Sequence, residues 1–407
     1  MTNGLVDKIH CMLLRDWIMR HLPIQFSKRG ALQSLAEDIS RCAAEAKQHG
    51  KDLVSMNVGA PGTGAPKQAL EALQRQMAKD VLGYTTSDGL PLLRERICQM
   101  YAEQYQQIVS PNNIIVTYGA SAAMLMACLA LADVGNKIAV PLPCYSNYLV
   151  SFRRLGLNIE YIETDFEHNF CITPEQVMAL DSDVQALIII NPSNPTGSII
   201  SPADYEQIIN ICLERNITVI SDEIYQNIVF DSAKPVETAL KHSRDLIIIN
   251  SFSKYYSMPG WRVGWMVVPD YLSDQMKSVA RSLFIAPPTP SQYVAAAAMD
   301  CEDELQDHLT VYAKNREILL QQMPQIGFDR FSSTDGAFYF YAHTRHLHCN
   351  CIEFCQKMIN EAGVIASPGK AFDPISGDHY VRFSYAGTTA SIERAVDRLQ
   401  RWVPTLK

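Results

Sequence analysis

The sequence lacks the features that mark nucleic-acid-binding proteins. Among its 407 residues, acidic side chains outnumber basic ones, and the formal net charge is −8. No run of lysine or arginine offsets this excess locally, so the chain has no basic segment that would attract a polyanion. We therefore expect no nucleic-acid partner.

Long apolar runs are also missing. The apolar stretch Gly119 to Ala132 is too short to span a bilayer and is rich in small residues. Residues 1–23 are interrupted by charged side chains such as Lys8 and Asp16, so they lack the core of a secretory signal. They predict a short amphipathic helix instead, and we expect no association with a membrane.

Paired cysteines are absent as well. Eleven cysteines are scattered along the chain, mostly singly and inside apolar segments, as at Cys98, Cys128 and Cys212. Buried reduced thiols have this distribution, and an odd number does not fit a framework of disulfides. We therefore expect a cytoplasmic location.

What the sequence does contain is an alternation of short apolar runs and helical patterns. Continuous Ile, Val and Leu runs fit strands covered on both faces, and helices between them supply the crossovers. The predicted fold is therefore α/β, with a doubly wound, mostly parallel sheet. The predicted strands are 114–117, 137–140, 186–190, 217–220, 246–250 and 263–268, and the clearest helices are 120–132 and 202–215.

The pattern changes after about residue 300 and indicates a smaller α+β domain. There we predict helices over about 304–323 and from about residues 351 and 391, with strands at 337–341 and 380–384. The predicted organisation is an N-terminal arm with part of the small domain (1–55), a large ligand-binding domain (56–300) and a small C-terminal domain (301–407).

Polar residues follow several predicted strands, at the places where ligands bind in a doubly wound sheet. Tyr118-Gly119-Ala120-Ser121 opens a helix, and small residues there leave backbone N–H groups free for a phosphate. Asn194 lies in the turn NPSNPTG, and Asp222 ends a strand with Tyr225 one helical turn further on. Each feature alone has a simpler explanation, as a tight turn or a helix N-cap.

A single lysine, Lys254, follows the apolar run 246–249 within SFSKYYSMPGWRVGW. Burial at a strand end lowers the pKa of an amine, and a neutral amine can condense with an aldehyde. Ser251 and Arg262 flank it, and arginine binds phosphate oxygens in a bidentate fashion. A lysine for a Schiff base, Asp222 for a pyridine nitrogen, a hydroxyl and an amide for a phenolic oxygen, and a phosphate site together point to pyridoxal phosphate.

These residues carry a resemblance to a known family, the class I and II aminotransferases, which are fold-type I pyridoxal phosphate enzymes. It extends from about Gly59 to the C-terminus. The motifs found in family order are Tyr84-Thr85 with Gly89, Tyr118-Gly119-Ala120, Pro143-Cys144-Tyr145, NPSNPTG, Asp222 to Tyr225, SFSKYYSMPGWRVGW and Val381-Arg382-Phe383-Ser384. The resemblance implies transfer of an amino group between an L-amino acid and a 2-oxo acid, in a homodimer with shared active sites.

The resemblance also implies catalytic roles. Lys254 would hold the cofactor as a Schiff base and later move the proton of the substrate α-carbon. Asp222 would keep the pyridine nitrogen protonated. Tyr225 and Asn194 would hydrogen-bond to the phenolic oxygen, and Tyr145 would stack on the ring.

The remaining matching residues would bind the cofactor's phosphate or the substrate. Arg382 would bind the substrate α-carboxylate, with Gly59 and Asn194 close to it. An unpaired arginine between the apolar residues Val381 and Phe383 would be costly, which favours such a role over a surface charge. The phosphate would be bound by Ala120, Ser121, Ser251, Arg262 and Ser253, and by Tyr84 of the partner subunit.

Two other motifs have weaker functional interpretations. The loop from Gly59 to Lys67 resembles a nucleotide-binding loop, but Ala65 and Pro66 stand where a lysine and a Ser or Thr are required. A group of histidines and cysteines suggests zinc but lacks a CxxC pair, so a surface loop leading into an amphipathic helix is the simpler interpretation and we expect no metal. Its members are His343, His346, His348, Cys349, Cys351 and Cys355.

Transamination is not the only reaction that this constellation allows. A lyase or a cyclase on the same scaffold would begin from the same carbanion, and a non-catalytic sensor would need a DNA-binding domain that we do not find before residue 50. The amino donor is also open. Some bacterial members that act on acidic substrates carry a lysine where this chain has Ser121, which disfavours aspartate.

Overall fold

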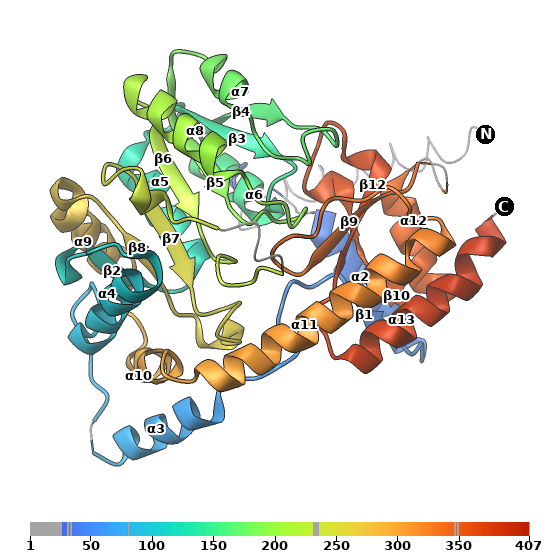
Figure 1. The fold of residues 1–407 in the computed structure, drawn as a ribbon, viewed down its shortest axis with the longest axis horizontal. Helices are drawn as coiled ribbons and strands as arrows, with labels where there is room; N and C mark the ends of the chain where they lie inside the picture. Colours follow the sequence, from blue (N-terminus) through green and yellow to red (C-terminus); the bar gives the residue numbers. More distant parts are fainter. Residues whose placement is uncertain are drawn as a thin grey trace.

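The computed structural model describes residues 27–30, 32, 35–79, 81–230, 236–345, 347 and 350–406. The amphipathic helix predicted over residues 1–23 lies outside them. Figure 1 shows a large sheet from the middle of the chain on one side and a smaller group of strands and helices, mostly from the C-terminal part, on the other. Within the described residues, no helix is both long and apolar enough to cross a membrane.

The large sheet has seven strands in the order β2-β8-β7-β6-β5-β3-β4. β8 runs antiparallel to both of its neighbours, and the other pairings are parallel. This confirms the predicted α/β fold with a mostly parallel sheet. The bounds are β2 Ile114–Thr117, β3 Lys137–Leu142, β4 Asn158–Glu163, β5 Val184–Ile190, β6 Thr218–Asp222, β7 Ile247–Ser251 and β8 Gly264–Val267.

Helices cover both faces of this sheet. Consecutive strand residues enter different apolar clusters: Ile248 belongs to one, whereas Ile247 and Ile249 belong to the other, and all three are fully buried. This double burial explains the continuous apolar runs. One face is covered by α5 (Ala120–Leu131), α6 (Ser146–Leu155) and α9 (Asp270–Phe284), and the other by α4 (Pro91–Tyr105), α8 (Pro202–Glu214) and α10 (Thr289–Ala298), with α3 (Lys67–Met77) packed on α10 and α7 (Pro174–Met178) on α8.

Strand β4 was not predicted from the sequence. It is an edge strand that pairs only with β3, and its polar residues Asn158 and Glu163 are exposed. An edge strand that is partly solvated does not need a continuous apolar run, so the pattern that identified the central strands was missing here.

The C-terminal part has an apolar cluster of its own. A three-stranded antiparallel sheet, in the order β11-β12-β9, packs with helices α11, α12 and α13, and the long α11 runs along the molecule toward α10 (Figure 1). The bounds are α11 Glu302–Gln322, β9 Tyr339–His343, α12 Cys351–Lys357, β11 Ser367–Pro368, β12 Tyr380–Ser384 and α13 Thr389–Trp402. β9 begins two residues later than predicted, because Ala337 has a φ of 55°, which an extended strand does not accommodate.

Part of the N-terminal region joins this cluster. Ile39 of α2 (Leu35–Gln48) is buried in it, and β1 (Val54–Ser55) pairs in parallel with β10 (Val364–Ile365). Segments from opposite ends of the chain are therefore held together by one core. The domain boundaries at residues 55 and 300 stay a prediction.

Candidate active site

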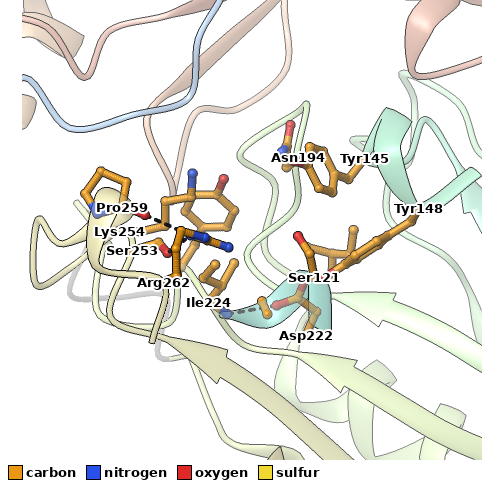
Figure 2. A pocket seen from close by; sticks show the side chains of 13 residues that line it. Ser121, Tyr145, Tyr148, Asn194, Asp222, Ile224, Ser253, Lys254, Pro259 and Arg262 are labelled. Carbon is orange, nitrogen blue, oxygen red and sulfur yellow. Dashed lines mark hydrogen bonds between the residues drawn. The ribbon is translucent and has the colours of Figure 1, made fainter. Parts of the chain in front are cut away.

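The carboxyl ends of β2, β3, β5, β6 and β7 meet at one edge of the large sheet. Strand β8 runs in the opposite direction, so its first residue, Gly264, pairs with Ser251 at the end of β7. Arg262, two residues before Gly264, therefore lies at the same edge. A first cavity of about 120 Å³ opens there (Figure 2). Its lining residues are Ala120, Ser121, Tyr145, Tyr148, Ile190, Asn194, Asp222, Ile224, Tyr225, Ser253, Lys254, Pro259 and Arg262.

Most of the predicted site residues therefore line one cavity. Ser251 does not: its buried hydroxyl oxygen lies 3.0 Å from the carbonyl oxygen of Val263 and 2.9 Å from Oγ of Ser253. Tyr84 is 86% exposed and lies outside the cavity. Gly59 and Arg382 line a second cavity next to the first.

Lys254 lies just beyond β7, and its side chain reaches into the first cavity (Figure 2). Its amine donates a hydrogen bond to the carbonyl oxygen of Gly59 and lies 5.8 Å from the centre of the Tyr225 ring. Burial lowers the pKa of this amine to about 8; the positive charge of Arg382 acts in the same direction and Asp222 opposes it. At neutral pH roughly a tenth of the amine is then unprotonated and able to act as a nucleophile.

Asp222, at the end of β6, is only 3% exposed. Burial raises the pKa of its carboxyl group to about 6, against the hydrogen bonds that it accepts and the charge of Lys254. Tyr148 donates to Oδ2 over 2.7 Å, and the backbone N–H of Ile224 donates to Oδ1 over 3.2 Å. A cation placed beside this carboxyl group would favour its ionised form, which suits a partner for a protonated ring nitrogen.

The first cavity also contains groups that are suited to an anion. Helix α5 begins at Ala120, so its free N–H groups and the positive end of its dipole lie there. Its N-cap, Gly119, has a φ of 78°, and a Cβ atom at this position would lie 2.5 Å from Nη2 of Arg262. Arg262 donates to Ser253 Oγ and to the backbone oxygens of Pro259 and Tyr118. This glycine therefore lets the helix start and the guanidinium group approach each other closely, as a bound phosphate would require.

The second cavity has a volume of about 220 Å³ and shares Tyr145 with the first. Arg382 of β12 donates to Asn194 Oδ1 over 2.7 Å and to the carbonyl oxygen of Asn57 over 2.6 Å. Its guanidinium carbon lies 4.4 Å from the centre of the Tyr339 ring and 4.5 Å from that of Phe372.

Arg382 is only 5% exposed, and within the described part of the chain no carboxylate pairs with it and its Nε has no hydrogen-bond partner. A buried cation that lacks a counter-ion is costly, so this site is suited to an anion from outside the chain. The sequence suggested that an arginine at this position would be unpaired within the chain. In the described residues it is buried and has no carboxylate partner.

Gly59 is required by close packing. A Cβ atom at this position would collide with the hydroxyl group of Tyr339, which is itself hydrogen-bonded to the hydroxyl group of Tyr225 over 2.6 Å. The loop that resembles a nucleotide-binding motif therefore begins against the two cavities. It ends at Lys67, whose backbone N–H donates to Glu304 of α11.

Sequence reasoning missed three residues of the site: Tyr148, Tyr339 and Phe372. A signal existed for Tyr148, because it lies three residues after Tyr145 and so on the same side of a helix. Tyr339 and Phe372 belong to the C-terminal part and meet Arg382 only through the tertiary fold. Nothing in their local sequence distinguishes them from core aromatics.

The group of histidines and cysteines for which we expected no metal is only partly described, since His346, His348 and Cys349 lie outside the described residues. Cys351 and Cys355 are buried inside α12, among its apolar side chains. In the described part of the chain, acidic oxygens close enough to share a metal occur at Glu160, Asp181 and Asp183. The amine of Lys137 already forms ion pairs with all three.

The chain was compared with known protein families and structures. The family model for aminotransferase class I and II matches residues 51–399. The chain belongs to the class I and II aminotransferase family. As an aminotransferase, it transfers an amino group between an amino acid and a 2-oxo acid.

Individual relatives and structures support the same conclusion. The aminotransferase is 34% identical to a valine–pyruvate aminotransferase of Mycobacterium tuberculosis, over 90% of this chain and 95% of the relative. It is 30% identical to an aspartate aminotransferase of Geobacillus stearothermophilus, over 90% of this chain and 95% of the relative. A crystal structure of an aminotransferase from Mycobacterium tuberculosis superposes with a TM-score of 0.91 at 33% identity, covering 94% of this chain and all of that one.

Proposed function

We propose that this aminotransferase uses pyridoxal phosphate, bound in the first cavity and attached to Lys254. The observation that carries the proposal is an amine of lowered pKa and a buried carboxyl group, Asp222, in one cavity that also contains Arg262 and the start of α5. When bound, pyridoxal phosphate supplies an aldehyde for amines and a ring that accepts electrons from the substrate α-carbon. The residues of the chain bind it, orient it and move protons.

Three residues would carry the proton chemistry. Lys254 would hold the cofactor through its amine and, once displaced by the amino group of the substrate, would take the proton from the α-carbon and return it. Asp222, kept ionised by Tyr148 and by a neighbouring cation, would hold a proton on the pyridine nitrogen. Tyr225 would donate a hydrogen bond to the phenolic oxygen, together with the amide of Asn194.

Binding would be divided between the two cavities. Arg382 would bind the substrate α-carboxylate, with Asn194 and Gly59 beside it. Tyr145, which lines both cavities, would pack against the cofactor ring. Ser251, through its contact with Ser253, would orient that hydroxyl group. The proposed phosphate site consists of Ala120, Ser121, Ser253 and Arg262.

Three experiments test the cofactor and the reaction. Borohydride reduction of the purified protein, followed by peptide mapping, should place a pyridoxyl group on Lys254. The variant Lys254→Ala should lose at least about 10⁴-fold in transamination rate, because it lacks both the covalent link and the base, whereas Lys314→Ala at an exposed position of α11 should not. A pyridoxyl group at another lysine, or substantial turnover by Lys254→Ala, would refute the assignment. Conversion that depends on a 2-oxo acid, rather than release of ammonia, separates transamination from the alternative lyase or cyclase.

We also propose a homodimer in which Tyr84 reaches the phosphate site of the partner subunit. The support is that this large side chain is 86% exposed and lies outside both cavities of its own chain. Mixing the variants Lys254→Ala and Tyr84→Ala provides a test. If Tyr84 acts across the interface, a mixed dimer contains one site with both residues intact, and the activity of the mixture should exceed the sum of the activities of the two variants alone. Activity no greater than the sum of the two variants would contradict the shared site.

A cytoplasmic location completes the proposal. Eight cysteines within the described residues, among them Cys42, Cys98 and Cys128, have free thiols, which suits a reducing compartment. Fractionation of cells that contain the tagged protein, with a cytoplasmic and a secreted marker, tests this location.

A further inference from the structure

The second cavity is nearly free of charge. Its lining residues include one ionisable side chain other than tyrosine, Arg382, whose guanidinium group is the site proposed for the α-carboxylate. The other lining residues are Ile39, Ser40, Asn57, Val58, Gly59, Tyr145, Ser146, Asn147, Ser367, Pro368, Ala371 and Phe372. A second carboxylate in this cavity would find no second cation among them, and an ammonium group would find no acid.

A charged residue that is next to this cavity in the sequence forms an ion pair elsewhere. Lys370 lies between the lining residues Pro368 and Ala371, but its amine forms an ion pair with Asp378 over 2.5 Å. Lys254 and Arg262 line the first cavity, where the cofactor is proposed to lie. Among the described residues that line the second cavity, Arg382 is therefore the only cation.

The polar side chains of this cavity are largely engaged with the protein itself. Ser367 donates to the carbonyl oxygen of Asn57 over 3.1 Å, and Asn147 donates to the hydroxyl group of Tyr145 over 2.9 Å. A polar ligand group would have to compete with these hydrogen bonds.

The remaining walls are apolar and come from three parts of the chain. Ile39 belongs to α2, Val58 to the loop after β1, and Phe372 to the segment between β11 and β12. Val58 is 57% exposed. An aliphatic ligand group that covers it would remove apolar surface from water, which is favourable in proportion to the area covered.

We infer that the amino donor is an α-amino acid with an uncharged, aliphatic side chain, which lies in the second cavity against Val58, Ile39 and Phe372. This inference rests on the proposed function, because Arg382 must bind the α-carboxylate for the side chain to lie there. It excludes dicarboxylic and dibasic amino acids as preferred donors.

The first test compares donors with the same side-chain skeleton, using the purified holoenzyme. Leucine, asparagine and aspartate have side chains with the same number and branching of heavy atoms, and they differ in polarity and charge. In single-turnover measurements of the cofactor absorbance, leucine should react with a kcat/KM at least about 100-fold above aspartate, because the aspartate side chain would be buried without a counter-ion. Among aliphatic donors, each added methylene that is buried should raise kcat/KM about fourfold.

The outcomes separate the inference from the function on which it rests. If no amino acid changes the cofactor absorbance, the proposed transamination fails. If donors react but aspartate or glutamate matches leucine, the function stands and the inference about the side chain is overturned.

The second test measures binding without reaction. The acids 4-methylpentanoate and succinate are leucine and aspartate without their amino groups, so they cannot be transaminated. By titration calorimetry of the holoenzyme, 4-methylpentanoate should bind at least about tenfold more tightly than succinate. Equal binding of the two acids, or tighter binding of succinate, would overturn the inference.

A pair of variants tests the position of the side chain. Val58→Lys would place a cation at the rim of the second cavity, and Val58→Gln is its uncharged control of similar length. The ratio of kcat/KM for aspartate to that for leucine should rise at least about tenfold in Val58→Lys relative to Val58→Gln. The same ratio in both variants would show that the donor side chain does not lie at this wall.

Discussion

The hydrogen bond from Tyr148 to Asp222 gives a prediction that can be worked out quantitatively. Burial raises the pKa of Asp222 to about 6, and the phenol is one of the groups that hold it down. A hydrogen bond to a charged group contributes about 1.5–3 kcal/mol, and about 1.4 kcal/mol corresponds to a change of 1 in pKa. Tyr148→Phe should therefore raise the pKa of this carboxyl group by about 1 to 2.

The sign of the effect can be checked without the cofactor. The pKa of Asp222 is higher in the folded than in the unfolded protein, so between those two values the folded state binds more protons. The free energy of unfolding of the cofactor-free protein should therefore fall as the pH rises from about 4 to about 6. In Tyr148→Phe the fall should continue to about pH 7–8, which denaturant titrations at a series of pH values would detect.

The same change should appear in catalysis. A carboxyl group that is largely protonated at pH 7 cannot hold a proton on the ring nitrogen of the proposed cofactor. The ionised fraction at pH 7 falls about 2–10-fold when the pKa rises from about 6 by about 1 to 2, so kcat/KM at pH 7 should fall by the same factor and its acid limb should move up by about 1 to 2 pH units. Tyr145→Phe is the matched control, because the hydroxyl group of Tyr145 accepts from Asn147 and has no hydrogen bond to Asp222. An acid limb that moves equally in both variants, or in neither, would refute the reasoning.

Three further predictions concern other parts of the site. Gly119→Ala should weaken cofactor binding at least about tenfold, because the φ of Gly119 is 78° and a Cβ atom would lie 2.5 Å from Nη2 of Arg262. Gly260→Ala is the control, since the space around Gly260 is open and cofactor binding should not change. Equal dissociation constants for both variants and the parent protein would contradict this prediction. Arg382→Lys should raise KM for the amino donor at least about 30-fold, because a single ammonium group cannot bind the carboxylate as a bidentate partner, and an unchanged KM in initial-rate assays would exclude the proposed carboxylate site. The rate of cofactor attachment to the cofactor-free protein should increase with pH around a midpoint near 8, the lowered pKa of Lys254, and a midpoint above 10 in stopped-flow absorbance would show that the amine is not desolvated.

The sequence predicted those features whose signal is local. Lys254 and Asp222 each follow a continuous apolar run, and a doubly wound sheet brings such strand ends to one edge. The direction of β8 was not evident, because a strand buried on both faces has the same apolar run in either direction. Arg262 reaches the site because that strand is antiparallel.

The features that the sequence did not predict depend on contacts between distant segments. Tyr148 and Asp222 are 74 residues apart, and Asn194 and Arg382 are 188 residues apart. An aromatic or amide side chain shows nothing locally about which distant partner it will meet. The lining of the second cavity likewise combines α2, the loop after β1 and the segments around β11 and β12, so it could be recognised only in the folded chain.

The contact between Asn194 and Arg382 has a consequence for synthesis of the protein. Residues that line the first cavity extend only from Ala120 to Arg262, whereas Arg382 is synthesised well after Arg262. A chain that stops before β12 contains every residue that lines the first cavity but lacks the guanidinium group proposed to recognise the amino acid. It would also lack the buried residues of β12 and α13, so the apolar cluster of the C-terminal part can form only after these elements have been synthesised.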